Sequence, residues 1–259
     1  MRTRSRRVAA LSILVWEACL MLEFAPAEAS AWNLFTDKTV VGSGHAAMEK
    51  RELTTFQKIA VDLPCKVELV QGSSENITIE ADDNLLPLIE TVVSNGQLTI
   101  RATQGTALSS RSTIKMTVNA RGIEALAVAG SAALFAARLQ SPKLAGDIAG
   151  SGTITIKDLQ NDALSISIAG SGRFEAQGVS TSMDISIAGS GDIRAARLSV
   201  QNVNVSIAGS GDATLWVQKT LTASIVGSGN VRYYGEGSAR ETSTTGSGKV
   251  KHMGTSPPM

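Results

Sequence analysis

The sequence predicts an all-β protein whose chain winds into a solenoid, a β-helix with coils of about 19–20 residues. Two observations lead to this prediction. A glycine corner recurs at a nearly constant interval, and the residues around it repeat the same apolar and polar positions from unit to unit. A unit of this length cannot bury a hydrophobic face alone, so neighbouring units must stack and share one core.

The corner motif is Gly-Ser-Gly in every unit except the first, which reads Gly130-Ser131-Ala132. The later motifs begin at Gly150, Gly170, Gly189, Gly209, Gly227 and Gly246, which gives steps of 20, 20, 19, 20, 18 and 19 residues. Glycine suits a corner where φ is positive or where the next coil approaches closely. Parallel coils rise about 4.8 Å each, so seven stacked corners should span roughly 29 Å.

Three columns run through the repeats. Two residues before the corner glycine stand Val128, Ile148, Ile168, Ile187, Ile207, Ile225 and Thr244. Three residues before it stand Ala127, Asp147, Ser167, Ser186, Ser206, Ser224 and Ser243. Four residues after it stand Leu134, Ile154, Phe174, Ile193, Ala213, Val231 and Val250. Because strand side chains alternate between two faces, the apolar columns should point inward and the serine column outward. Neither the leucine-rich nor the propeller pattern is present.

The remaining chain divides into four parts. Residues 1–31 are predicted to be a secretory signal peptide, with four arginines, an apolar run over 8–22 and the small-residue site Ala29-Ser30-Ala31. Residues 32–52 are expected to be a flexible leader, and 251–259 a disordered tail after the 126–250 repeats. Residues 53–125 should form a β-rich N-terminal portion that protects one end, with strands near 59–63, 66–70, 77–81, 97–102 and 114–118 and one helical turn in 83–90.

Composition limits the partners and the compartment. Loss of residues 1–31 removes four arginines and three glutamates, so the net charge falls from +1 to 0, which argues against nucleic-acid binding. No later segment reaches membrane-spanning length. With the predicted signal peptide, the expected location is the periplasm or the cell surface.

Cys65 would be the single cysteine left after loss of residues 1–31. We interpret it as a buried apolar residue and not as a reactive thiol, because the neighbouring Lys66 should point to the opposite face of the strand.

Three segments carry a family resemblance: residues 84–90, residues 95–100 and the repeated Ile-Ala-Gly-Ser-Gly units. Together they resemble the bacterial family called putative auto-transporter adhesin, head GIN domain, over roughly 56–234. The resemblance implies a right-handed single-stranded β-helix in an exported protein. It supplies no catalytic residues, and for function it implies interaction at the envelope or surface.

One outward column carries charge. It reads Ala133, Thr153, Arg173, Asp192, Asp212, Asn230 and Lys249. Arg173 and Asp192 should form a surface ion pair one coil apart. The adjacent carboxylates of Asp192 and Asp212 should repel each other. We favour the interpretation that solvation and the nearby Arg173 offset this repulsion. A bound cation such as calcium is the alternative.

An active site is not expected. Sugar cleavage needs paired carboxylates or a base with a metal, and small and apolar residues separate the available acids, Asp147, Asp158, Asp162, Glu175 and Asp184. The two histidines, His45 and His252, lie in the leader and the tail, so the serine column has no evident base. We assign no catalytic, cofactor-binding or metal-binding residue, and no cofactor.

The sequence thus favours an exported, non-catalytic protein of binding or adhesion type. Its expected partner is an envelope glycan or a surface protein. The alternatives are a structural scaffold that assembles with itself by end or edge stacking and, least favoured, a polysaccharide-active enzyme. Glycan binding and concentration-dependent assembly distinguish the first two.

Overall fold

Corner glycines fix the register of the solenoid. The computed structural model describes residues 38–110 and 112–257, and in it each corner glycine from Gly130 to Gly246 lies beside the next one. The two predicted apolar columns also lie in register, and their members up to Ile225 and Val231 are buried. The serine column is exposed. The predicted β-solenoid is therefore confirmed.

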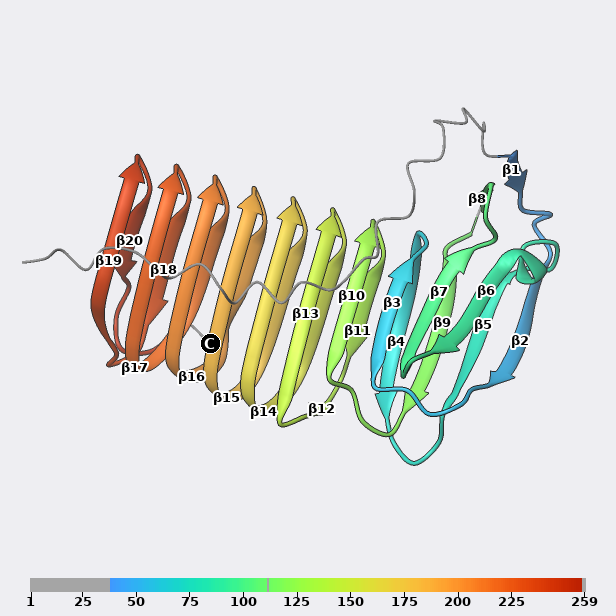
Figure 1. Cartoon of the computed structure of the whole chain (residues 1–259), viewed down its shortest axis with the longest axis horizontal. Coiled ribbons are helices and arrows are strands. Elements are labelled where there is room, and N and C mark those ends of the chain that lie inside the picture. The colour runs from blue at the N-terminus through green and yellow to red at the C-terminus, as the bar shows by residue number, and fades with distance from the viewer. Residues whose placement is uncertain (1–37, 111, 258–259) are drawn as a thin grey trace, which may run out of the picture. The chain divides into compact units, whose positions relative to one another are not determined.

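Parallel strands form the repeat region, and from β14 to β17 a single bent strand makes up most of each coil (Figure 1). The strands are β10 (Ala125–Gly130), β11 (Ala133–Ala136), β12 (Leu139–Gln140), β13 (Lys143–Gly150), β14 (Thr153–Gly170), β15 (Arg173–Gly189), β16 (Asp192–Gly209), β17 (Asp212–Gly227), β18 (Asn230–Tyr234), β19 (Ser238–Gly246) and β20 (Lys249–His252).

The N-terminal portion contains the five predicted strands and the helical turn. Strands β1 (Lys38–Val41) and β2 (Ala46–Glu52) precede it, within the predicted leader, and its own elements are β3 (Lys58–Asp62), β4 (Cys65–Gln71), β5 (Asn76–Asp82), the 3-10 helix η1 (Leu86–Leu88), β6 (Ile89–Ser94), β7 (Gln97–Ala102), β8 (Thr106–Ser109) and β9 (Ile114–Ala120). Strands β1, β2, β6 and β8 were not predicted from the sequence.

The first coils stack in an order that differs from the chain order. Strand β3 pairs in parallel with both β7 and β10, and β4 pairs in parallel with both β9 and β11. The coil made by β3 and β4 therefore lies between a later coil and the repeats. Antiparallel pairs β6–β7, β5–β9 and β2–β5 close this end (Figure 1). One hydrophobic core runs from Phe56 to Tyr233, so residues 53–125 are continuous with the β-helix.

Two expectations for the chain ends are wrong within the described residues. The leader 32–52 is not flexible throughout, because β2 pairs with β5 over seven residues and Arg51 donates to the backbone oxygens of Leu86 and Ile89. This edge strand is polar and half-exposed, so it lacks the apolar pattern of a core strand. The tail is ordered through at least Gly254, whose oxygen accepts a hydrogen bond from the Gly235 nitrogen at 3.0 Å. The predicted signal peptide, residues 1–31, lies outside the described residues.

The corner glycines are needed for close stacking. At Gly209, φ is +130°, and an added Cβ would lie 2.3 Å from the carbonyl oxygen of Gly189. Gly130 also has a positive φ, +68°, but an added Cβ there would meet no atom within 4 Å. Gly72 has neither constraint. Backbone strain and steric clash can therefore be separated by substitution.

We expect Gly209→Ala to lower the free energy of unfolding by about 2–5 kcal/mol, because it adds a clash to an unfavourable φ. Gly130→Ala should cost about 1–2 kcal/mol for the positive φ alone, and Gly72→Ala less than about 0.5 kcal/mol. Urea denaturation monitored by circular dichroism measures all three. Equal losses for Gly209→Ala and Gly130→Ala would show that the clash with the neighbouring coil adds nothing to the cost of the positive φ.

A short polar column lies inside the turn opposite the corner. Asn161 and Ser180 lie in register there, and Val200 and Val217 continue the column in later coils. The Ser180 hydroxyl donates to the oxygen of Ser182 at 2.9 Å. Both amide atoms of Asn161 are buried and have no hydrogen-bond partner among the described residues. Asn161 is therefore the costly member of this column.

Asn161→Val should stabilise the protein by about 1 kcal/mol, since an unsatisfied amide is replaced by the side chain that the column already accepts. For a chain of this size, that gain corresponds to an increase in Tm of about 2–4 °C. Ser180→Val is the matched control, because it removes a satisfied hydroxyl from the same column and should give no gain. A lower Tm for Asn161→Val would mean that the amide binds an ordered water.

Candidate functional site

The charged column lies where each coil leaves its corner. Strands β15, β16, β17 and β18 begin at Arg173, Asp192, Asp212 and Asn230, which lie in register in neighbouring coils. The following residue in each strand is buried. The column residues therefore point outward, as their alternation with the inner column requires.

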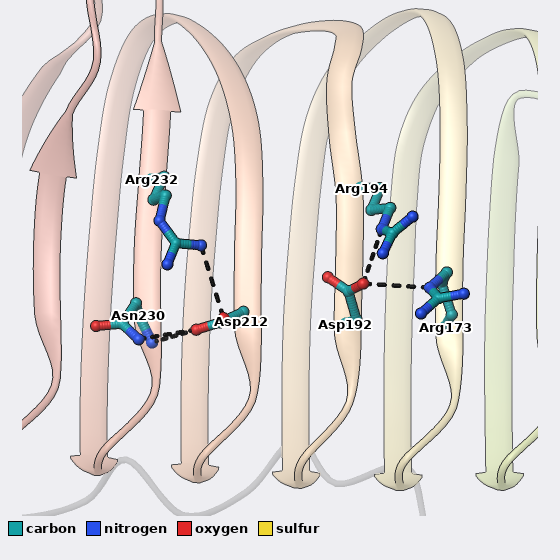
Figure 2. A network of polar contacts seen from close by, with 6 residues as sticks. All are labelled: Arg173, Asp192, Arg194, Asp212, Asn230 and Arg232. Atoms are coloured by element: carbon teal, nitrogen blue, oxygen red, sulfur yellow. Dashed lines mark hydrogen bonds and ion pairs between the residues drawn. The ribbon is translucent and has the colours of Figure 1, made fainter.

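Asp192 joins two arginines. Its Oδ2 accepts hydrogen bonds from Nε of Arg173 at 3.2 Å and from Nε of Arg194 at 2.8 Å (Figure 2). The first contact confirms the predicted pair between neighbouring coils. Arg194 was missed, although its position two residues after Asp192 places both side chains on one face of β16.

Asp212 has a separate set of partners. Its Oδ1 accepts from the backbone nitrogen and from Nδ2 of Asn230, at 3.1 and 2.9 Å. Its Oδ2 lies 3.6 Å from Nη1 of Arg232 (Figure 2). Side chains of the chain itself therefore supply positive charge and donors to both Asp192 and Asp212. The hypothesis that a cation separates them gains no support from this geometry.

Unequal coil lengths interrupt the surface beside this network. The coil from Gly189 to Gly209 has 20 residues, whereas the coil before it has 19 and the coil after it has 18. The extra residues are accommodated in β16, where 196–198 have no partner in β17 and the register with β15 also shifts. Bulges of this kind redirect side chains and often lie next to binding sites.

A groove of about 680 Å³ lies at this bulge, and we call it the charged groove. Its volume falls in the range of small-molecule sites. It spans β15 to β18, and its charged lining residues are Glu175, Asp192, Asp212, Arg194, Arg197 and Arg232. Hydroxyl and amide groups also line it, from Ser190, Ser210, Thr214 and Gln177.

Arg197 is the arginine placed by the bulge. It is exposed, and no carboxylate forms an ion pair with it in the described part of the chain. Glu175 pairs instead with Lys157, at 2.7 Å. The groove thus contains several charged side chains that are paired with one another or with neighbours, together with the Arg197 guanidinium, which pairs with no carboxylate of the described residues.

The acids weighed as catalytic groups are dispersed. Asp158 pairs with Arg138, and Asp184 accepts a hydrogen bond from Asn204. Asp147 lies on the outer face before the corner, and partial burial raises the pKa of its carboxyl above the usual value. Asp162 lines a different depression, at the turn opposite the corner. Among these acids, only Glu175 reaches the charged groove.

The other reactive residues also lie apart from the groove. His45 precedes β2, and His252 in β20 contacts the Tyr233 ring with centroids 4.8 Å apart. Cys65 is buried, Lys66 faces outward as predicted, and burial raises the pKa of the Cys65 thiol to about 12. No group of three or more His, Cys, Asp or Glu side chains arranged to hold a metal occurs in residues 38–110 and 112–257. Within the same ranges, no helix has the length and apolar character needed to cross a membrane.

Comparisons with solved structures agree with the fold. A putative adhesin from Bacteroides fragilis superposes with a TM-score of 0.75 at 21% identity, covering 83% of this chain and 100% of its own. A putative adhesin from Parabacteroides merdae has a TM-score of 0.66 at 25% identity and covers 83% and 99%. A protein from Parabacteroides distasonis described as a putative lipid binding protein has a TM-score of 0.67 at 24% identity and covers 83% and 100%.

The search of curated proteins gives no match. The family model described as putative auto-transporter adhesin, head GIN domain, matches residues 55–237, which is most of the chain and includes the charged groove. The chain therefore belongs to the putative auto-transporter adhesin, head GIN domain family.

Proposed function

We propose that this chain is an exported, non-catalytic binding protein of adhesion type, which acts at the bacterial cell envelope and holds its ligand in the charged groove. Membership of an adhesin family supports the general class. The signal-like N-terminus supports export. The particular site is supported by one structural feature, the groove at the β16 bulge.

The charges in the groove are not a requirement of the fold. Ala133 and Thr153 occupy the same column in earlier coils and stack in the same register. The side chains of these ion pairs are 29–53% exposed, and ion pairs at the surface contribute only about 0–1 kcal/mol each. Stability therefore does not explain why arginine and aspartate are concentrated where a coil of 20 residues lies between coils of 19 and 18. Ligand binding does explain it.

A binding role accounts for the chemistry better than catalysis. A carboxyl group that acts as a general acid usually lies in an apolar pocket, whereas Asp192 and Asp212 lie against arginine and asparagine donors. Lipid binding, the description given to the relative from P. distasonis, fits less well, because nine of the thirteen lining residues carry a charged or hydroxyl side chain.

Self-assembly by end stacking is the weaker alternative. At the C-terminal end, the inner column changes from Ile225 to Thr244, which is exposed. Lys249 and Lys251 lie on the final strand β20. Polar inner residues and lysines on an edge strand oppose further pairing.

Thr214→Trp should lower binding of the purified full chain to isolated envelope fractions at least fivefold, because the indole would fill the groove. Thr155→Trp is the matched control. Thr155, Glu175, Arg194 and Thr214 occupy one column in successive coils, and Thr155 lies outside the groove. Co-sedimentation measures the bound fraction. Equal binding by the two variants would exclude the groove, and no binding by the unmodified chain would contradict the proposed function.

Export predicts that cells expressing the full chain contain a processed form that begins near Trp32 and lies outside the cytoplasm. Deletion of residues 8–22 should leave an unprocessed chain in the cytoplasm, because the apolar run is lost. Cell fractionation and N-terminal sequencing test this. An unprocessed wild-type chain in the cytoplasmic fraction would refute the export prediction.

A further inference from the structure

We propose that the charged groove recognises a carboxylate-bearing sugar unit of an acidic glycan, and that Arg197 is its specificity-determining residue. This inference rests on the proposed function, because it assigns a ligand class to the same groove. It follows from three features: which arginine nitrogens are already used, the balance of charge, and the hydroxyl-binding groups beside them.

The arginines present unused donors. Arg173 and Arg194 both contact Asp192 through Nε, and no acceptor among the described residues hydrogen-bonds their terminal Nη groups. Arg232 lies 3.6 Å from Asp212, beyond hydrogen-bond distance, while Asn230 occupies the other oxygen of that carboxylate. Arg197 has no internal carboxylate within the described residues. Among the arginines that line the groove, Asp192 therefore orients Arg194 by a hydrogen bond, and no carboxylate of the described residues hydrogen-bonds Arg197 or Arg232.

Charge in and around the groove favours an anion. Its lining carries three arginines and three carboxylates. Two of those carboxylates, Glu175 and Asp192, are also paired with cations outside the lining, Lys157 and Arg173. Five cationic groups therefore face three anionic ones. A ligand with a negative charge would restore the balance.

The donors beside the arginines favour a carboxylate over a phosphate. A guanidinium forms a two-point hydrogen bond with either anion, so the arginines alone do not choose between them. Phosphate sites commonly use free backbone N–H groups and lysine. Here the backbone nitrogens of Ser190 and Ser210 already donate to Gly170 and Gly189 of the preceding coils, and no lysine lines the groove.

The remaining lining groups suit sugar hydroxyls. Gln177, Ser190, Ser210 and Thr214 can both donate and accept hydrogen bonds. Asp192 Oδ1 has no donor among the described residues and can accept a hydroxyl hydrogen. A simple anion would use only the arginines, and a neutral sugar would leave Arg197 unpaired. A sugar that carries a carboxylate uses both sets.

Isothermal titration calorimetry of the full chain tests the inference with trigalacturonic acid and 3′-sialyllactose, each compared with its methyl ester. At least one acid should bind at least tenfold more tightly than its ester, and added salt should weaken that binding. Arg197→Gln should lower the affinity at least tenfold. Arg197→Lys should lower it less, because it keeps the charge but loses the two-point geometry. Arg138→Gln is the control. It removes an exposed arginine outside the groove, one that pairs with Asp158, and it should leave the affinity unchanged.

The inference is overturned if acids and esters bind alike, if neither acid binds, if mannose 6-phosphate binds more tightly than both acids, or if Arg197→Gln binds like the wild type with an unchanged Tm. Should Thr214→Trp abolish envelope binding while the acids fail, the groove stands as a site and only the ligand class falls. If Thr214→Trp leaves envelope binding intact, the groove falls as well, together with this inference.

Discussion

The structure depends on the contact between successive corner glycines. Each carbonyl at a corner lies so close to the next glycine that a Cβ would overlap it, and the same carbonyl accepts the backbone N–H of the serine in the next coil. Because this contact recurs from Gly130 to Gly246, it sets the register of the strand residues on both sides of each corner. Once the corner register is set, the inner isoleucines of successive coils lie next to one another and form a continuous core.

A register fixed at one corner leaves freedom elsewhere in the coil. Differences in coil length cannot be absorbed at the glycines, so they appear as bulges away from them, as at 196–198. Outward positions are similarly unconstrained, which is why one column can read Thr153, Arg173, Asp192 and Asp212 without a change of fold. The solenoid therefore supplies a rigid scaffold on which a local irregularity creates a groove.

The repeat region could be predicted from sequence because its units are nearly identical, so alignment on glycine already gives the register. In the N-terminal portion five strands could be predicted, but their pairing could not, because these strands share no repeat. Strand β3 lies between β7 and β10, and β4 lies between β9 and β11, so the stacking order differs from the chain order. Edge strand β2 lacks an apolar face and gave no pattern. The groove did have a signal: the steps of 19, 20 and 18 residues imply bulges in β16, and an arginine two residues after Asp192 must share its face.

The two adjacent aspartates show how a repeated fold tolerates like charges in register. A ladder of carboxylates would be repulsive, but each one here is engaged from a different direction, Asp192 by arginines in β15 and β16 and Asp212 by residues of β18. The resulting contacts add little stability at the surface. Their main physical effect is to hold guanidinium groups in defined orientations before any ligand arrives. Such preorganisation lowers the entropic cost of binding, and it arises here from side chains that the fold does not need.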